Sequence, residues 1–292
     1  MSEETAGTFE ELAGGYAFVE APRGALDGSQ WFSDLLGASV YRRNTQGDVQ
    51  AMLTGRDWVG GIVMDTSGQV LCSGRGGIVA VDPATGLTRM VLDSIEGEPI
   101  IAVNDMEGDG QGGLYGGTID FVSIMERGEP PAPGRFFHMD ADGNVTVLRR
   151  DVQASNGIGF SPCGKWLYHS ETGCGVWRYP LADGKAGAPE LFIPLPDSDG
   201  MVVDREGGLW VACWESGRLL HFNASGSETH RLTCPYPHIV SLGFEPGDLT
   251  SLLVSTGGNA TVTGSGALLR LRVDVPGVPE HPTTLAMLEK AS

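Results

Sequence analysis

Oxygen-bearing side chains recur at one position of a repeated sequence unit. The unit is marked by a turn residue, and the intervals between successive copies are 40, 44, 52, 43 and 41 residues. The turn residues are Gly28, Gly68, Gly112, Gly164, Gly207 and Asp248. Eight residues before them stand Glu20, Gly60, Asn104, Asn156, Asp199 and Val240. Carboxylate and amide oxygens are the ligands that hard cations such as Ca²⁺ prefer, so four of the six positions have the chemistry of a divalent-metal site.

A simpler explanation applies to each of these residues singly. Asn and Asp before glycine are ordinary turn formers. The shared offset in four units favours a joint role, because turn formation alone does not require carboxylates or amides at the same place. Two carboxylates, Glu20 and Asp199, would also neutralise a divalent cation and so reduce the cost of burying the cluster.

The surrounding sequence indicates which elements must position these side chains. Segments 61–74, 157–170 and 200–213 each read as a short strand, a polar turn closed by glycine, and a second strand rich in β-branched and aromatic residues. Units of about 40–50 residues with four short strands are typical of propeller blades. The sequence therefore predicts an all-β, six-bladed β-propeller with four-stranded antiparallel blades around a central channel. The innermost strands would bring the four side chains to one mouth of that channel.

The predicted propeller occupies the whole chain as a single domain, 1–292. Its core covers approximately 16–275, with tails at 1–15 and 276–292. The long interval of 52 residues is explained by an insertion at 121–135, rich in Pro, Gly and charge, which is predicted to be a surface loop and a candidate lid. The segment around Tyr16 is a candidate to close the ring by pairing with the last blade near Leu268.

Composition restricts the partners and the compartment. The net charge of −18 disfavours binding to nucleic acid or to a membrane surface. Five cysteines without a Cys-x-x-Cys pair indicate neither a disulfide framework nor a thiolate zinc site. The acidic N-terminus lacks the apolar segment of a signal peptide, so a cytoplasmic protein is predicted. The oligomeric state stays open.

The same residues carry a family resemblance over roughly residues 16–275. The chain resembles the gluconolactonase, regucalcin (senescence marker protein) and luciferin-regenerating enzyme family of six-bladed propellers. The matching segments are 103–105 (Val-Asn-Asp), 116–120 (Gly-Gly-Thr-Ile-Asp), 155–162, 199–204 with 208–212, and 242–244 with 252–256. The resemblance implies that Glu20, Asn156 and Asp199 bind one divalent cation, for which Ca²⁺ is the first choice and Zn²⁺, Mn²⁺ or Mg²⁺ are alternatives.

The resemblance also implies an activity. Asn104 would lie beside the metal and hold substrate or water, and Asp199 would act as general base. The implied reaction is metal-dependent hydrolysis of a lactone or a related cyclic ester, with the carbonyl polarised by the cation. Two alternatives stay open. One is carbon–carbon hydrolysis or isomerisation of a cyclic ketone at the same metal, and the other is a calcium-binding propeller without enzymatic activity.

One departure from the family affects the predicted substrate. Sugar-lactone members often carry Arg two residues before the conserved Asn, where this chain has Ala102. An apolar or aromatic lactone is therefore predicted, rather than a simple sugar-acid lactone. The candidate substrate-binding residues, besides Asn104, are Trp58, Phe121, Trp214 and Tyr236, and His238 is a candidate acid/base or orienting residue. Packing between blades is the competing explanation for the aromatic residues, and capping of a strand is the competing explanation for His238.

Overall fold

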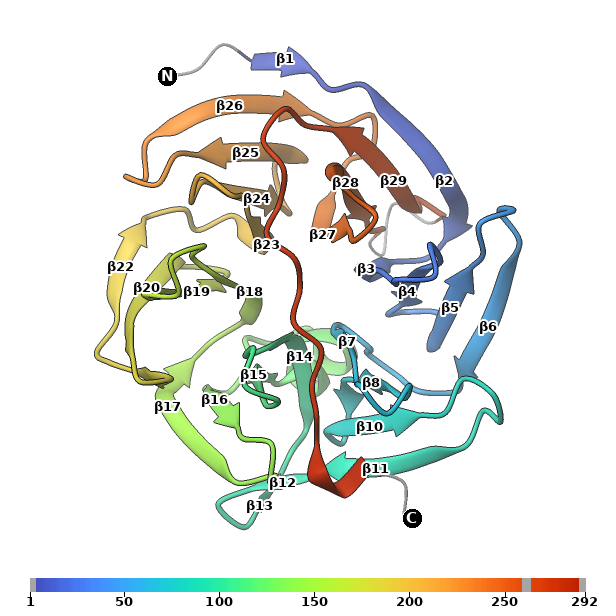
Figure 1. Cartoon of the computed structure of the whole chain (residues 1–292), viewed down its shortest axis with the longest axis vertical. Helices are drawn as coiled ribbons and strands as arrows, with labels where there is room; N and C mark the ends of the chain where they lie inside the picture. The colour runs from blue at the N-terminus through green and yellow to red at the C-terminus, as the bar shows by residue number, and fades with distance from the viewer. Residues whose placement is uncertain (1–3, 259–263, 289–292) are drawn as a thin grey trace.

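The computed structural model describes residues 4–258 and 264–288, which form six blades around one central axis (Figure 1). Blade 1 consists of β3 (Val19–Gly24), β4 (Gln30–Asp34), β5 (Ser39–Arg43) and β6 (Val49–Thr54). Blade 2 consists of β7 (Ile62–Met64), β8 (Val70–Cys72), β10 (Ile78–Val81) and β11 (Thr88–Leu92). Blade 3 consists of β14 (Ala102–Gly108), β15 (Leu114–Ile119), β16 (Gly134–Met139) and β17 (Val145–Val152), with the short β9 (Gly74–Arg75) paired to β14.

The remaining blades follow the same plan. Blade 4 consists of β18 (Ser155–Phe160), β19 (Trp166–Glu171) and β20 (Gly175–Ala182), which pairs with both β21 (Lys185–Ala186) and β22 (Glu190–Ile193). Blade 5 consists of β23 (Ser198–Val203), β24 (Leu209–Cys213), β25 (Arg218–Phe222), β26 (Glu228–Thr233) and β1 (Glu4–Ala6). Blade 6 consists of β27 (Ile239–Glu245), β28 (Asp248–Thr256), β29 (Gly266–Arg272) and β2 (Phe9–Tyr16). A small hairpin, β12 (Ser94–Ile95) and β13 (Glu98–Pro99), follows blade 2. The predicted six-bladed, all-β fold is confirmed.

The core lies between neighbouring blades. Inner strands such as β14 are buried along their whole length, whereas outer strands such as β6 are largely exposed. Adjacent inner strands approach closely where glycine follows the position of the repeated polar residue. A Cβ atom at Gly157 would lie 2.3 Å from the Met201 nitrogen, and one at Gly200 would lie 2.6 Å from the Ser241 Cα. This close packing holds the beginnings of the inner strands in fixed positions around the axis.

The N-terminal segment closes the ring. β2 pairs antiparallel with β29, and Ala13 lies opposite Leu268. The predicted tail at 1–15 is therefore corrected, because residues 9–16 form the outer strand of blade 6. Leu12 and Tyr16 pack against a buried cluster that includes Phe32 and Leu253. This burial explains why the strand forms although its sequence, FEELAGGY, lacks a regular alternation of apolar and polar residues.

Truncation should separate the two N-terminal strands. We expect deletion of residues 1–16 to lower the melting temperature by about 10 °C or more, because it removes half-buried apolar side chains and leaves β29 without a partner. Deletion of residues 1–7 is the matched control, since it removes only the exposed β1. Differential scanning fluorimetry measures both. Equal melting temperatures for the two deletions would contradict the proposed closure.

The C-terminal segment is a strap across the ring rather than a tail. Residues 276–288, here called the strap, form bridges between Gly277 and Asp204 of blade 5 and between Thr283 and Asp65 of blade 2. It ends in the short helix η2 (Ala286–Leu288), whose Leu288 is buried. Figure 1 shows the strap in red crossing the middle of the ring. We call this side the strap face, and the opposite side, where the inner strands begin, the site face.

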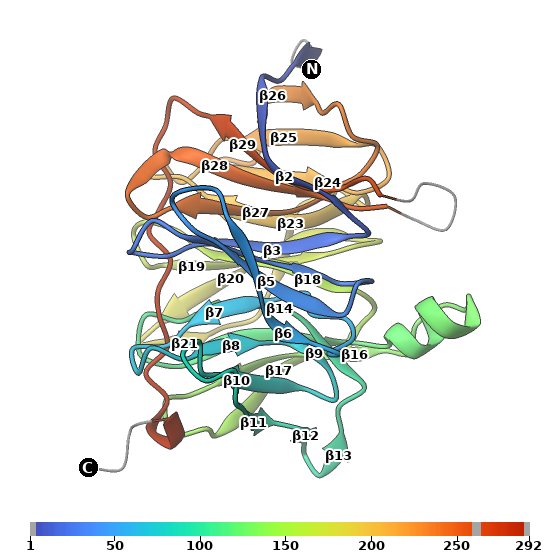
Figure 2. The same cartoon turned by 90° about the vertical axis from the view of Figure 1, so that its right-hand side faces the viewer.

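The insertion projects from the site face. It contains one π-helical segment, η1 (Val122–Arg127), which Figure 2 shows on the side away from the strap. Both ends of the insertion are tied to Asp120, whose carboxylate accepts hydrogen bonds from the Ser123 amide (3.0 Å) and the Ala132 amide (3.1 Å). The part predicted to be a surface loop is thus a helical turn anchored at its base. All five cysteines are free thiols, and no helix in the described ranges is long and apolar enough to cross a membrane.

Candidate metal centre

The repeated polar residues stand at the beginnings of inner strands. Glu20, Asn156 and Asp199 are the second residues of β3, β18 and β23, and Asn104 is the third residue of β14. The pairing of each of these strands with its neighbour shifts register across that position or just after it. Such bulges re-aim side chains relative to the regular pleat. The structure thus brings the four side chains to the site face, close to the central axis, where Figure 1 shows β3, β14, β18 and β23 arranged around it.

A chain of hydrogen bonds orients the two amides. The Asn104 Nδ2 donates to the Ser155 carbonyl (2.8 Å) and to the Asn156 Oδ1 (2.6 Å). The Asn156 Nδ2 donates to the Thr172 hydroxyl (2.7 Å), which in turn donates to the Ser198 carbonyl (2.6 Å). With both Nδ2 groups engaged, the Asn104 Oδ1 is buried without a hydrogen-bond partner. A buried acceptor of this kind costs free energy unless a ligand or water satisfies it.

The carboxylates of the cluster are buried and repel one another. Burial, followed by the charges of Asp199 and Asp105, raises the pKa of Glu20 well above its ordinary value. Burial and the charges of Asp105 and Asp197 do the same to the pKa of Asp199. Burial also raises the pKa of Asp105 to about 6, although Arg23 opposes this shift. A cation among these oxygens would relieve the repulsion.

The donor set therefore fits a hard divalent cation. Two carboxylates and the amide oxygens of Asn104 and Asn156 are the oxygen ligands that Ca²⁺ uses. Within residues 4–258 and 264–288, no three His, Cys, Asp or Glu side chains converge as a metal-binding group, so amide oxygens are needed to complete the site. The guanidinium of Arg23 is paired on the strap side with Glu107 at 3.2 Å and Glu280 at 3.5 Å.

The two remaining repeat positions carry no oxygen ligand. Gly60 precedes β7, and a Cβ atom there would lie 2.1 Å from the Asn104 Oδ1. Glycine at this position therefore leaves room for the oriented amide. Val240, the second residue of β27, is fully buried among apolar side chains. The oxygen donors come from blades 1, 3, 4 and 5 only.

Aromatic residues surround the cluster on the site face. Trp58, Phe121 and Trp214 belong to one apolar cluster that also contains Phe18 and Ala102. The Trp58 and Phe121 rings are 5.6 Å apart, and Phe18 stacks on Trp214 at 5.2 Å. The structure thus brings together three of the four aromatic residues predicted to bind substrate.

Phe18 was missed by sequence reasoning, although a signal for it exists. It stands two residues before Glu20, as Trp58 stands two residues before Gly60 and Ala102 two residues before Asn104. His238 stands two residues before Val240 and stacks on Trp214 at 4.2 Å. The residues two positions before the repeated polar residues therefore form much of the edge of the site around the oxygen cluster. We call this edge the rim.

The two other predicted residues differ in their placement. The His238 Nδ1 lies 2.9 Å from the Trp214 carbonyl. Because a carbonyl only accepts, Nδ1 carries a proton and the half-buried ring is held on the rim. The Tyr236 hydroxyl instead donates to the Glu11 carboxylate, and its ring packs between blades 5 and 6. The structure does not bring Tyr236 together with the other aromatic residues.

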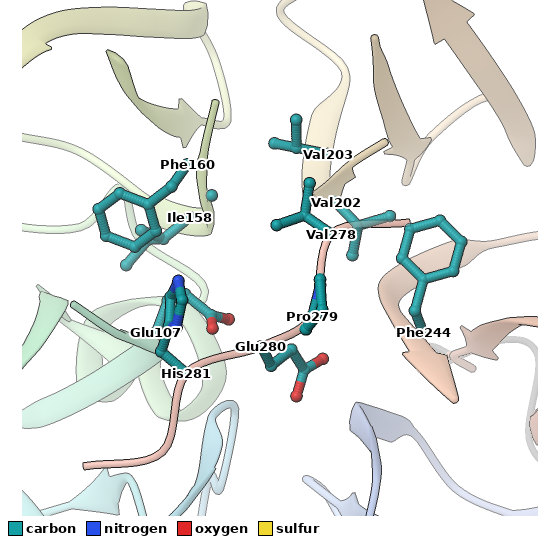
Figure 3. Close-up of a pocket in the computed structure, with 11 residues that line it drawn as sticks. Glu107, Ile158, Phe160, Val202, Val203, Phe244, Val278, Pro279, Glu280 and His281 are labelled. Carbon is teal, nitrogen blue, oxygen red and sulfur yellow. The ribbon is translucent and has the colours of Figure 1, made fainter. Parts of the chain in front are cut away.

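The strap face has a cavity of its own. It measures about 40 Å³ and is lined by Glu107, Ile158, Phe160, Val203, Val278 and Glu280 among others (Figure 3). Burial raises the pKa of Glu107 to about 8, with Arg23 opposing the shift. A cavity of this size holds one water molecule or a few, but not a lactone.

Comparison with known proteins identifies the family of the chain. A family model described as the SMP-30/Gluconolactonase/LRE-like region matches residues 19–258. Pentonolactonase XacC of Haloferax volcanii is 34% identical over 195 residues, which are 61% of this chain and 64% of that protein, slightly less than two thirds of its length. The 6-deoxy-6-sulfogluconolactonase of Pseudomonas putida is 27% identical over 266 residues, covering 86% of this chain and 89% of that protein.

A solved structure shows the same fold. The crystal structure of the calcium-binding protein regucalcin from Agrobacterium tumefaciens aligns with a TM-score of 0.86 at 23% identity, covering 98% of this chain and 100% of that one. The match to the family model covers the inner strands of all six blades and every residue of the oxygen cluster. The chain belongs to the SMP-30/Gluconolactonase/LRE-like family.

Proposed function

We propose that this protein is a divalent-metal-dependent hydrolase that opens a lactone at the site face. The observation that carries the proposal is the set of buried oxygens at the start of the inner strands. Burial and the charge of Asp199 raise the pKa of Glu20, and the Asn104 Oδ1 is buried without a partner. The relatives named above, a pentonolactonase and a sulfogluconolactonase, support the reaction class.

The chain's own residues have separable roles in this reaction. Glu20, Asn156 and Asp199 would hold the cation, for which Ca²⁺ is our first choice because all the donors are oxygens. When bound, the cation would supply Lewis-acid polarisation of the substrate carbonyl. Asp199 accepts a proton from the water whose oxygen attacks the carbonyl carbon. The ring C–O bond then breaks, and the departing alkoxide takes up a proton, giving a hydroxy acid.

Neighbouring side chains orient the reactants. The Asn104 Oδ1 is an acceptor for the attacking water or for a substrate hydroxyl, because the Nδ2 of the same amide is held by Ser155 and Asn156. His238, held against Trp214 through its Nδ1–H, is our candidate for protonating the leaving oxygen, a step that uses the imidazolium form with a second proton on Nε2. Trp58 and Phe121 provide apolar contact for the substrate ring.

The predicted preference for an apolar or aromatic lactone has no support from these relatives, whose names are those of sugar lactonases. We therefore propose a sugar-derived lactone as the substrate class. No feature of the described site favours carbon–carbon hydrolysis, isomerisation of a ketone or a purely calcium-binding role over lactone opening.

A lactone panel tests the proposal. Metal-stripped protein is assayed in a pH-stat against sugar-derived, aliphatic and aromatic lactones, with Ca²⁺, Mn²⁺, Mg²⁺ and Zn²⁺ restored one at a time. We expect turnover of at least one sugar-derived lactone that depends on the added cation. Measurable cation binding in calorimetry without opening of any lactone would refute the hydrolase and leave a binding role. Turnover that persists without a cation would refute the metal dependence.

A further inference from the structure

A guanidinium stands beside Ala102 in β14, two residues before Asn104. The short strand β9 leaves blade 2 and pairs with β14 of blade 3, and it places Arg75 directly opposite Ala102. A positive charge is thereby supplied at the rim from a different strand. The residue is half-exposed, with 43% of its side chain accessible.

An aromatic platform supports this guanidinium. The Arg75 Cζ lies 3.7 Å from the centre of the Trp58 ring, which is a cation–π contact. Trp58 adopts a left-handed backbone conformation with φ of 62°, which is unusual for a bulky residue and persists only where the surroundings enforce it. Its amide donates to the Leu35 carbonyl at 3.3 Å. The surrounding fold therefore holds this platform in place, two residues before Gly60, where a Cβ atom would lie 2.1 Å from the Asn104 Oδ1.

Two exposed carboxylates occupy the guanidinium in this structure. The Arg75 Nε lies 3.0 Å from the Asp57 carboxylate, and Nη2 pairs with the Glu126 carboxylate of η1. The accessible fractions of the Asp57 and Glu126 side chains are 50% and 49%. Ion pairs with this exposure contribute little stability, so an anionic group of a ligand can replace one of them at small cost. The planar fork of arginine suits a carboxylate or another oxyanion with two acceptor oxygens.

We propose that Arg75 is the specificity-determining residue of the site and binds the ionised acid group of an acidic sugar lactone. Glu126 occupies the same fork in the absence of substrate and leaves it when substrate binds. The proposal rests on the lactonase function argued above and adds the substrate class, a lactone carrying a second, ionised acid group. The competing explanation is that the Arg75–Glu126 pair only fastens η1 to the rim.

Kinetics with paired substrates separate these explanations. The probes are glucono-δ-lactone, which is neutral, and glucaro-γ-lactone, which carries a free carboxylate. The readout is the ratio of kcat/KM for the acidic lactone to that for the neutral lactone. We expect Arg75→Ala to lower this ratio by about tenfold or more, the loss of one charge-assisted bond, mainly by raising KM for the acidic lactone. We expect Glu126→Gln to raise the ratio, because it frees the fork.

Arg75→Ala and Glu126→Gln would change the kinetics in the same direction if the Arg75–Glu126 ion pair only held η1 against the rim. In that case both break the same ion pair, and both lower turnover of the two lactones alike, which would overturn the proposal. Arg127→Ala is the matched control, since it removes an exposed positive charge from the same helix, η1, and should leave the ratio unchanged. Arg75→Lys keeps the charge but loses the fork and should give an intermediate ratio.

A binding measurement keeps this inference separate from the lactonase proposal. Calorimetric titration of wild-type protein and Arg75→Ala with glucarate, the ring-opened dianion, reports the anion contact without turnover. Arg75-dependent glucarate binding in a protein that opens no lactone would uphold the anion site and refute the lactonase. Glucarate affinity equal in the two proteins would overturn the role of Arg75, whatever the activity.

Discussion

Asp199→Asn is expected to lower kcat for lactone opening by about a thousandfold or more. The substitution removes the proposed general base, worth about a hundredfold to ten-thousandfold by itself, and it weakens the proposed cation site at the same time. The side chain keeps its shape, and Asp199 makes no ion pair within residues 4–258 and 264–288, so the melting temperature of the chelated, cation-free protein should not fall. Initial rates in a pH-stat and a thermal melt measure the two quantities.

Asp183→Asn is the matched control for this substitution. It removes one carboxylate from an exposed turn of blade 4, where the positive φ of 50° suits Asn as well as Asp. We expect its turnover to match that of the wild type. If Asp199→Asn kept more than a tenth of the wild-type rate under saturating cation, Asp199 would not be the base, and His238 would become the first residue to test.

Removal of the divalent cation is expected to destabilise the protein in a pH-dependent way. Saturating Ca²⁺, at about a hundred times its dissociation constant, adds roughly 2.7 kcal/mol to the free energy of unfolding. For a domain of 292 residues that corresponds to a rise in melting temperature of roughly 4 °C. Differential scanning fluorimetry of chelated protein, with and without added Ca²⁺, measures the gain.

The direction of the pH dependence follows from the raised pKa values. In the cation-free fold the pKa values of Glu20 and Asp199 lie well above those of the unfolded chain, so the folded state binds more protons. The free energy of unfolding of the cation-free protein therefore falls as pH rises above the ordinary carboxyl range. The cation competes with those protons, so its stabilising effect should be larger at pH 8 than at pH 5. If Ca²⁺ stabilised the protein equally at pH 5 and pH 8, or if Glu20→Gln left this stabilisation unchanged, the result would argue against this site.

The oxygen cluster could be predicted because equivalent positions of successive propeller blades lie around one axis. Residues at a repeated position in the sequence therefore form a ring in the structure. Glu20 and Asp199 are far apart in the chain, yet a common offset from a recurring turn was enough to place both at the start of inner strands. The offset carried no information about the amide orientation of Asn104. That orientation depends on the Ser155 carbonyl and the Asn156 side chain, which belong to the next blade.

Other parts of the fold and of the site depend on contacts between distant segments, and these contacts produce no repeated pattern in the sequence. The segment 9–16 is a strand because β29 offers it an edge, and the strap lies where Asp65 and Asp204 receive it. Arg75 follows β8 in the sequence and would be assigned to blade 2, but its strand joins blade 3. Tyr236 was expected at the rim, whereas its hydroxyl is engaged by Glu11, a residue of that unrecognised strand. Each of these differences involves a pairing between distant parts of the chain.

The pairing of β2 with β29 also determines when the protein can finish folding during its synthesis. During synthesis β2 leaves the ribosome before β29, which begins 250 residues after β2 ends. At about 5–20 residues per second, β2 waits roughly 12–50 s for its partner. During that time the backbone groups of β2 are unpaired, which is a hazard for aggregation. A ribosome that stalls anywhere before Gly266 therefore holds a chain that cannot close, and such chains are natural clients for chaperones.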